Sequence, residues 1–251
     1  MASGNPVLRP NSFSGLAVDG ERMTVNGTIG KTAILLILLV VTAGWTWLRF
    51  DTALAAGGAN AASAAVEPFM MGGLIAGLVL ALLSVFVKRW IAITAPLYAI
   101  AEGFAVGGIS ALFDLRYPGI VTTAVALTFG VMAVMLFLYR SGIIKVTDKL
   151  RMGVVAATGG IMAVYLIDMV MGFFGAHMPL INSASPLGIG FSLLVVGIAA
   201  FNLLLDFDMI DRAAAAGAPR NMEWYGAFGL IVTLVWLYLE MLRLLSKLQR
   251  R

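Results

Sequence analysis

Cysteine is absent from this 251-residue sequence, and histidine occurs once, at position 177. These shortages exclude disulfide bonds, thiolate metal sites and any cluster of several histidines. Charged residues are also scarce, at 12% of the chain, whereas 61% of the residues are hydrophobic. A soluble domain of this length could not cover so much apolar surface, so the composition indicates a polytopic membrane protein.

The alternation of apolar and polar residues that marks transmembrane β-strands is missing as well. The apolar runs are instead long and rich in Leu, Val, Ile, Ala and Gly, which favours an all-α fold. The net charge of +4 lies in loops and chain ends, where membrane orientation places it. It therefore gives no reason to expect a nucleic-acid partner.

Hydropathy divides the chain into a tail and a membrane domain. Residues 1–30 are polar, and we interpret them as a mobile N-terminal tail that precedes the membrane domain at 31–251. The segment 51–67 is rich in small residues, which predicts a loop. Seven membrane spans are expected, at residues 31–49, 68–87, 91–113, 120–139, 152–174, 186–210 and 224–245.

The distribution of Lys and Arg predicts a cytoplasmic N-terminus. With that orientation the tail and inner loops carry eleven basic residues, and the outer loops carry two. The C-terminal end disagrees, because seven spans place it outside together with its basic residues Arg243, Lys247, Arg250 and Arg251. Either the last segment is re-entrant or this end is an exception to the rule.

Two acids lie in the third and fifth spans. Glu102 is next to Gly103 and Gly107, a GxxxG spacing that lets helices approach closely, so it is expected to face a neighbouring helix. It is either a protonated acid bonded to a carbonyl or hydroxyl group, or a functional acid. Asp168 lies late in its span, and the favoured interpretation is an interfacial carboxylate reached by water.

The sixth span ends in three aspartates, and helix geometry separates them. Asp206 and Asp208 point to nearly opposite faces, because successive residues are about 100° apart. Asp208 and Asp211 lie with Arg212 in what we interpret as a solvated helix end with an ion pair. Asp206 lies on a stripe of small and polar residues, so we expect its side chain to face the bundle, which favours a functional role. The other members of the stripe are Gly188, Ser192, Ala199 and Asn202.

The seventh span carries a matching stripe at a spacing of three or four residues. Its members are Gly226, Gly229, Thr233, Trp236 and Glu240. Glu240 is either a functional acid or a snorkelling acid paired with Arg243, and the sequence favours neither.

Enzyme and cofactor chemistry has little support in these residues. A retinal protein needs a lysine within the seventh span, and Lys247 lies past its end. An intramembrane protease would need a GxSxG or GxGD motif, and neither occurs. A single histidine in a loop, His177, serves a haem or metal carrier poorly. We therefore expect neither an enzyme nor a bound cofactor.

Three segments resemble the Bax inhibitor-1 (transmembrane Bax inhibitor motif) family, and its bacterial-type members in particular. They are YAIAEGFAVGGIS at 98–110, LLLDFDMID at 203–211 and WYGAFGLIVTLVWLYLEMLRLL at 224–245, within a similarity that covers roughly residues 30–248. The resemblance implies a seven-helix bundle with the last helix at its centre. It also implies a pH-sensitive calcium leak channel, here in a bacterial inner membrane.

In that family, one acid in span six and one in span seven form the gate. Asp206 matches the first, whereas Thr233 stands where the second is expected, and a threonine can donate a hydrogen bond but cannot share a titration. The leading hypothesis is a cation leak protein in which Glu102 and Asp206 attract Ca²⁺, an ion that prefers oxygen ligands. The alternative is a non-transporting scaffold that binds other membrane proteins.

Overall fold

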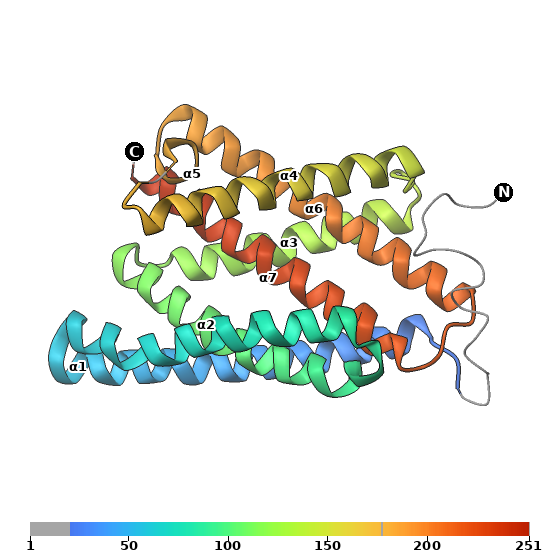
Figure 1. Cartoon of the computed structure of the whole chain (residues 1–251), viewed down its shortest axis with the longest axis horizontal. Helices are drawn as coiled ribbons and strands as arrows, with labels where there is room; N and C mark the ends of the chain where they lie inside the picture. The colour runs from blue at the N-terminus through green and yellow to red at the C-terminus, as the bar shows by residue number, and fades with distance from the viewer. Residues whose placement is uncertain (1–20, 177, 251) are drawn as a thin grey trace.

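The computed structural model describes residues 21–176 and 178–250, and this part of the chain is helical and crosses a membrane repeatedly, as expected (Figure 1). Six of its helices are long and apolar enough to span a bilayer. The elements in chain order are α1 (Val25–Phe86), the 3₁₀ turn η3 (Lys88–Trp90), α2 (Ile91–Arg116), α3 (Ile120–Arg140), α4 (Asp148–Phe173), the four-residue α5 (Pro179–Asn182), α6 (Pro186–Ala215) and α7 (Met222–Gln249).

Helix α1 is a hairpin of two arms, 25–57 and 59–86. Its backbone leaves the helical region only at Gly58, where φ is 76° and ψ is −171°, a conformation open to glycine. The rings of Trp45 and Phe69 lie 5.0 Å apart, although 24 residues of straight helix would separate them by about 36 Å. The two arms therefore lie antiparallel, and the chain makes the seven passes that hydropathy predicts (Figure 1).

Two predicted boundaries differ from the structure. The loop predicted at 51–67 is wrong, because both sides of Gly58 are helical; this segment is rich in alanine, the strongest helix former. Helix α1 begins at Val25, inside the segment interpreted as the tail, and the Thr24 side chain caps it. Met23 N donates to Ala218 O at 2.7 Å, so this start is tied to the α6–α7 loop. Residues 1–20 lie outside the described part.

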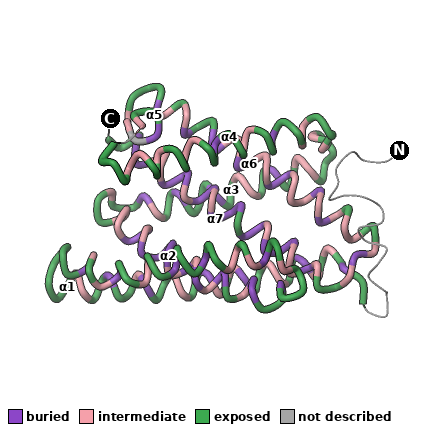
Figure 2. Tube along the Cα trace, in the orientation of Figure 1, coloured by how far each residue is buried: buried purple, intermediate pink, exposed green. Residues whose placement is uncertain are grey.

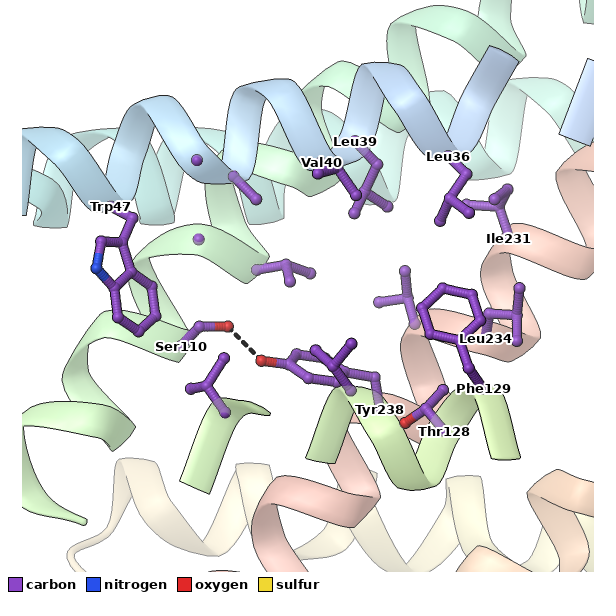
Figure 3. Close-up of a pocket in the computed structure, with 17 residues that line it drawn as sticks. Leu36, Leu39, Val40, Trp47, Ser110, Thr128, Phe129, Ile231, Leu234 and Tyr238 are labelled. Atoms are coloured by element: carbon purple, nitrogen blue, oxygen red, sulfur yellow. Dashed lines mark hydrogen bonds between the residues drawn. The ribbon is translucent and has the colours of Figure 1, made fainter. Parts of the chain in front are cut away.

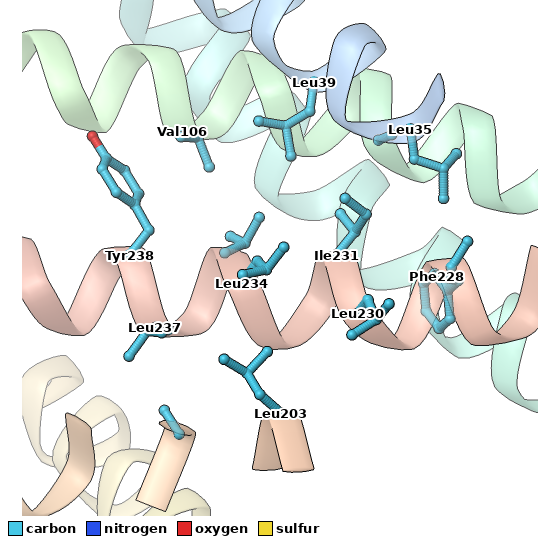
Figure 4. Packing of buried hydrophobic residues seen from close by; sticks show 14 of the residues in the cluster. Leu35, Leu39, Val106, Leu203, Phe228, Leu230, Ile231, Leu234, Leu237 and Tyr238 are labelled. Carbon is cyan, nitrogen blue, oxygen red and sulfur yellow. The ribbon is translucent and has the colours of Figure 1, made fainter. Parts of the chain in front are cut away.

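Helix α7 lies at the centre of the bundle, as expected from the family resemblance. It packs against α1, α2, α3 and α6, and 67% of its most apolar stretch is buried, against 11% for α4 (Figures 1 and 2). Figure 4 shows Ile231, Leu234 and Leu237 of α7 between α1 and α6, facing Leu35 and Leu203.

Close contact between α1 and α2 depends on small residues. A Cβ at Gly103 would overlap the Leu39 carbonyl and the Thr42 hydroxyl, and one at Gly107 would overlap the backbone of Ala43. The GxxxG spacing therefore brings two helix backbones together, as predicted.

The passes alternate in direction, so the bundle has two ends. The N-side end holds the start of α1, η3 and the α3–α4 and α6–α7 loops; the C-side end holds Gly58, the α2–α3 turn, α5 and the end of α7 (Figure 1). Helix α7 is continuous over 28 residues, about 42 Å at 1.5 Å per residue, so it is long enough to cross a bilayer core of about 30 Å. It is not re-entrant.

Candidate functional site

Asp206 faces the central helix. Ser185 caps α6 and Pro186 occupies its first turn, which starts the helix about five and a half turns before Asp206. Thr233 Oγ1 of α7 donates a hydrogen bond of 2.6 Å to Asp206 Oδ2. A Cβ at Gly229 would lie 3.8 Å from the same carboxylate, so the two helices are close here. The stripe predicted for α6 does face the bundle.

Asn202 joins α6 to α4, one turn before Asp206. Its Nδ2 donates to Thr158 Oγ1 of α4 at 2.9 Å and to the Ile198 carbonyl of its own helix at 2.9 Å. The amide therefore continues the polar contacts of Asp206 toward a third helix.

Asp208 is buried rather than solvated. Its residue is 8% exposed, and its Oδ2 pairs with Arg151 of α4 and with Arg212 at 2.8 Å. The predicted pair with Arg212 is confirmed, but the solvated helix end is wrong for Asp208, since the first turn of α4 covers it. Asp211, the third aspartate, accepts a hydrogen bond of 2.8 Å from Tyr139 of α3.

Glu240 is buried in the C-side half of α7, at 2% exposure. Its Oε1 accepts hydrogen bonds from Tyr165 of α4 at 2.9 Å and from Arg243 at 2.7 Å. Its Oε2 has no hydrogen-bond partner among the residues that the structure describes. The pairing with Arg243 is confirmed, whereas a snorkelling side chain is not what the structure shows.

The cations at the end of α7 have partners within the protein. Lys247 is 2% exposed and donates to the Gly188 carbonyl at 2.9 Å and to Ser192 Oγ at 2.8 Å. Arg250 donates to the Tyr117 hydroxyl at 2.6 Å. Part of the positive charge at this end therefore takes part in contacts between helices.

These contacts form one band, which we call the polar seam, between α4, α6 and α7. On α6 it extends from the Gly188 carbonyl to Asp208, about 30 Å along the helix, which equals the thickness of a bilayer core. On α4 its members recur every seven residues and so share one face. The seam comprises Arg151, Thr158 and Tyr165 of α4, Ser192, Asn202, Asp206 and Asp208 of α6, and Thr233, Glu240 and Lys247 of α7.

Glu102 lies outside the seam. Its carboxylate points at the second arm of α1, where a Cβ at Gly77 would be 2.7 Å from Oε2. On the same helix α2, the Tyr98 ring meets the Phe228 ring of α7 edge to face, with 5.1 Å between centroids, whereas Asp206 meets the other side of α7. The structure therefore does not bring Glu102 and Asp206 together.

Asp168 holds the chain between α4 and α5. Its Oδ1 accepts a hydrogen bond of 2.7 Å from the Met178 amide, and its residue is half-buried. His177 lies outside the described residues. No group of three or more His, Asp or Glu side chains that could hold a metal ion occurs in residues 21–176 and 178–250.

Fold and site together define a class: an integral membrane protein in which six passes surround a central last helix that is hydrogen-bonded to an aspartate of the sixth. The chain belongs to the Bax inhibitor 1 like family, whose sequence model matches residues 5–250. The resemblance seen in the three sequence segments is thereby confirmed. No curated protein and no solved structure matches the chain.

Proposed function

We propose that this membrane protein is a cation leak pathway along the polar seam, with Ca²⁺ as the ion and with pH control at Asp206. The observation that carries the proposal is the seam itself, in which carboxylate, hydroxyl and amide groups, with Lys247 at one end and Arg151 at the other, follow three helices for about the thickness of the bilayer core. Polar and ionisable groups inside a membrane are costly, and ion pathways are a common reason for their presence. Carboxylate, amide and hydroxyl oxygens are also suitable Ca²⁺ ligands.

Asp206 is the control point of this pathway. When ionised, its carboxylate attracts a cation and accepts the Thr233 hydrogen bond, which fixes α7 against α6. When protonated, it has no charge to attract the ion. Because Thr233 does not titrate, a single acid here, rather than a coupled pair, sets the response to pH.

Glu240 supplies a second acid on the central helix, seven residues after Thr233 and therefore about 10 Å further along the same face. Its Oε2 has no hydrogen-bond partner in the described part of the chain, and a passing cation or a water molecule would satisfy this buried acceptor. The Asp208–Arg151 pair lies at the N-side end of the seam. The N-side end carries most of the basic loop residues, which supports a cytoplasmic location for this end of the bundle. The membrane we propose is a bacterial inner membrane.

Calcium flux from liposomes tests the proposal. Purified protein is reconstituted around a calcium dye, and external Ca²⁺ entry is compared for the native chain, Asp206→Asn and protein-free liposomes. The native chain should leak above the protein-free level, and Asp206→Asn should reduce that leak. Stable, correctly inserted protein with no leak would contradict the proposal and favour the scaffold alternative, in which the seam only holds α4, α6 and α7 together.

A further inference from the structure

An apolar groove penetrates the bundle on the side away from the polar seam. It lies between the first arm of α1 and helices α2, α3 and α7, with a volume of about 280 Å³ (Figure 3). Leu36 and Val40 of α1 line one wall, Phe129 of α3 another, and Leu234 of α7 the floor. The groove thus reaches the central helix from the outer surface of the bundle.

The groove offers water few polar partners, because most of its lining is apolar. Its hydroxyl groups already bond one another or the backbone: Ser110 and Tyr238 share a hydrogen bond of 2.6 Å (Figure 3), and Thr128 donates to the Ala124 carbonyl at 2.7 Å. A buried water needs two to four polar partners, and apolar cavities stay dry. An apolar occupant is therefore favoured over solvent.

The mouth of the groove faces the hydrocarbon of the bilayer. Its rim residues Val40, Val125 and Phe129 are 57%, 39% and 37% exposed on membrane-spanning helices. Along α1 the lining runs from Leu36 to Trp47, about 16 Å at 1.5 Å per residue. That length is about half of a bilayer core of about 30 Å, so the groove matches the depth of one leaflet.

We propose that this groove binds one acyl chain of a bilayer phospholipid, whose headgroup lies at the C-side end. The groove reaches that end at Val121, the second residue of α3. Two guanidinium groups lie nearby: Arg116 ends α2 and Arg250 follows α7, and both lie over the Tyr117 ring. Guanidinium groups bind phosphate well, so charge complementarity with a phospholipid headgroup supports the proposal in addition to the agreement between groove length and leaflet depth.

The bound chain would contact α7 on the face opposite to Thr233. Ile231, Leu234 and Val235 line the groove, whereas Thr233 points at Asp206. The lipid site is therefore separate from the polar seam, and its existence does not depend on ion conduction.

Gly44 offers a way to fill the groove without disturbing the fold. It lines the groove, and a Cβ placed on it meets no atom within 4 Å. Gly130 of α3 also has open space around its Cβ but does not line the groove, so it provides a matched control. Val125→Phe is a second filling variant, since Val125 lies at the rim.

Native mass spectrometry of the full chain, purified from vesicles of phosphatidylglycerol and phosphatidylcholine, tests the proposal. The native chain and Gly130→Leu should each retain one tightly bound phospholipid, whereas Gly44→Leu and Val125→Phe should lose most of it at an unchanged melting temperature. No bound lipid in the native chain, equal retention in all variants, or equal loss in Gly130→Leu would overturn the proposal.

Tryptophan quenching locates the same lipid. Trp47 lines the groove, so a variant with Trp47 as its only tryptophan should be quenched by phospholipids brominated along the acyl chain. Adding Gly44→Leu should weaken that quenching by about half or more, whereas adding Gly130→Leu should leave it unchanged. Quenching that Gly44→Leu does not change would place the lipid outside the groove.

Discussion

Thr233 of the central helix donates a hydrogen bond of 2.6 Å to Asp206 of α6, and this contact joins the two helices in the N-side half of the bundle. The family resemblance leads one to expect an acid at position 233. A hydroxyl donor there changes the chemistry, because Asp206 gains a fixed hydrogen-bond donor but no second titrating partner.

Removing the Thr233 hydroxyl should destabilise the protein. Thr233→Val keeps the shape of the side chain but leaves the half-buried Asp206 carboxylate without its donor, at a cost of about 1–3 kcal/mol. Thr233→Ser keeps the hydroxyl and should cost less. Thermal unfolding in detergent measures both variants, and equal melting temperatures for the native chain and Thr233→Val would show that the bond contributes nothing.

Arg151 and Asp208 should be energetically coupled. Arg151→Gln leaves the largely buried Asp208 with Arg212 alone, whereas the double variant with Asp208→Asn also removes the charge that needs a partner. The coupling energy of this double-mutant cycle should be about 1–3 kcal/mol. The same cycle on Glu21 and Arg220, an exposed pair, should give less than about 1 kcal/mol. Equal couplings in the two cycles would contradict the burial of the first pair.

Small residues at the α1–α2 contact should be irreplaceable. Gly107→Ala places a methyl group against the Ala43 backbone and should cost about 1–3 kcal/mol or prevent folding. Gly130→Ala meets open space and should be neutral or slightly stabilising, because alanine favours helix. Size-exclusion profiles and melting temperatures compare the two, and similar behaviour would argue against close backbone packing.

The polar seam should admit small hydrophilic reagents. The chain has no cysteine, so single-cysteine variants have no background reactivity. Asn202→Cys lies in the seam, whereas Leu194→Cys lies on an exposed face of the same helix, toward lipid. A charged, membrane-impermeant thiosulfonate should modify Asn202→Cys several-fold faster than Leu194→Cys, and Ca²⁺ should slow the reaction. No reaction at Asn202→Cys would show that the seam is closed to water. Equal rates would show that the seam is no more accessible to water than the lipid-facing side of α6, and either result would contradict the prediction.

Much of the fold could be predicted from the sequence, because hydropathy and helical periodicity are local properties. Spans, the inward face of Asp206 and the stripe on α7 follow from residue spacing alone. The predicted loop at 51–67 failed because small residues suit both a loop and a tightly packed helical hairpin. Only Gly58 adopts a non-helical conformation there.

The partners of the site residues could not be predicted, since they depend on how the helices pack together. Arg151 gave no signal beyond a basic loop, yet it pairs with Asp208. Lys247 was expected past the end of the last span, yet it is buried against α6. The seven-residue spacing of Arg151, Thr158 and Tyr165 was the one sequence signal for the α4 face of the seam.

The central claim, that Asp206 controls a cation pathway, is tested most directly by Ca²⁺ entry into liposomes at pH 6 and pH 8. A carboxylate attracts cations and a carboxylic acid does not, so the native leak should be larger at pH 8. Asp206→Asn has no ionised form; its leak at pH 8 should fall about tenfold, equal to about 1.4 kcal/mol, and should no longer depend on pH. Equal leaks for the native chain and Asp206→Asn at both pH values would contradict the account.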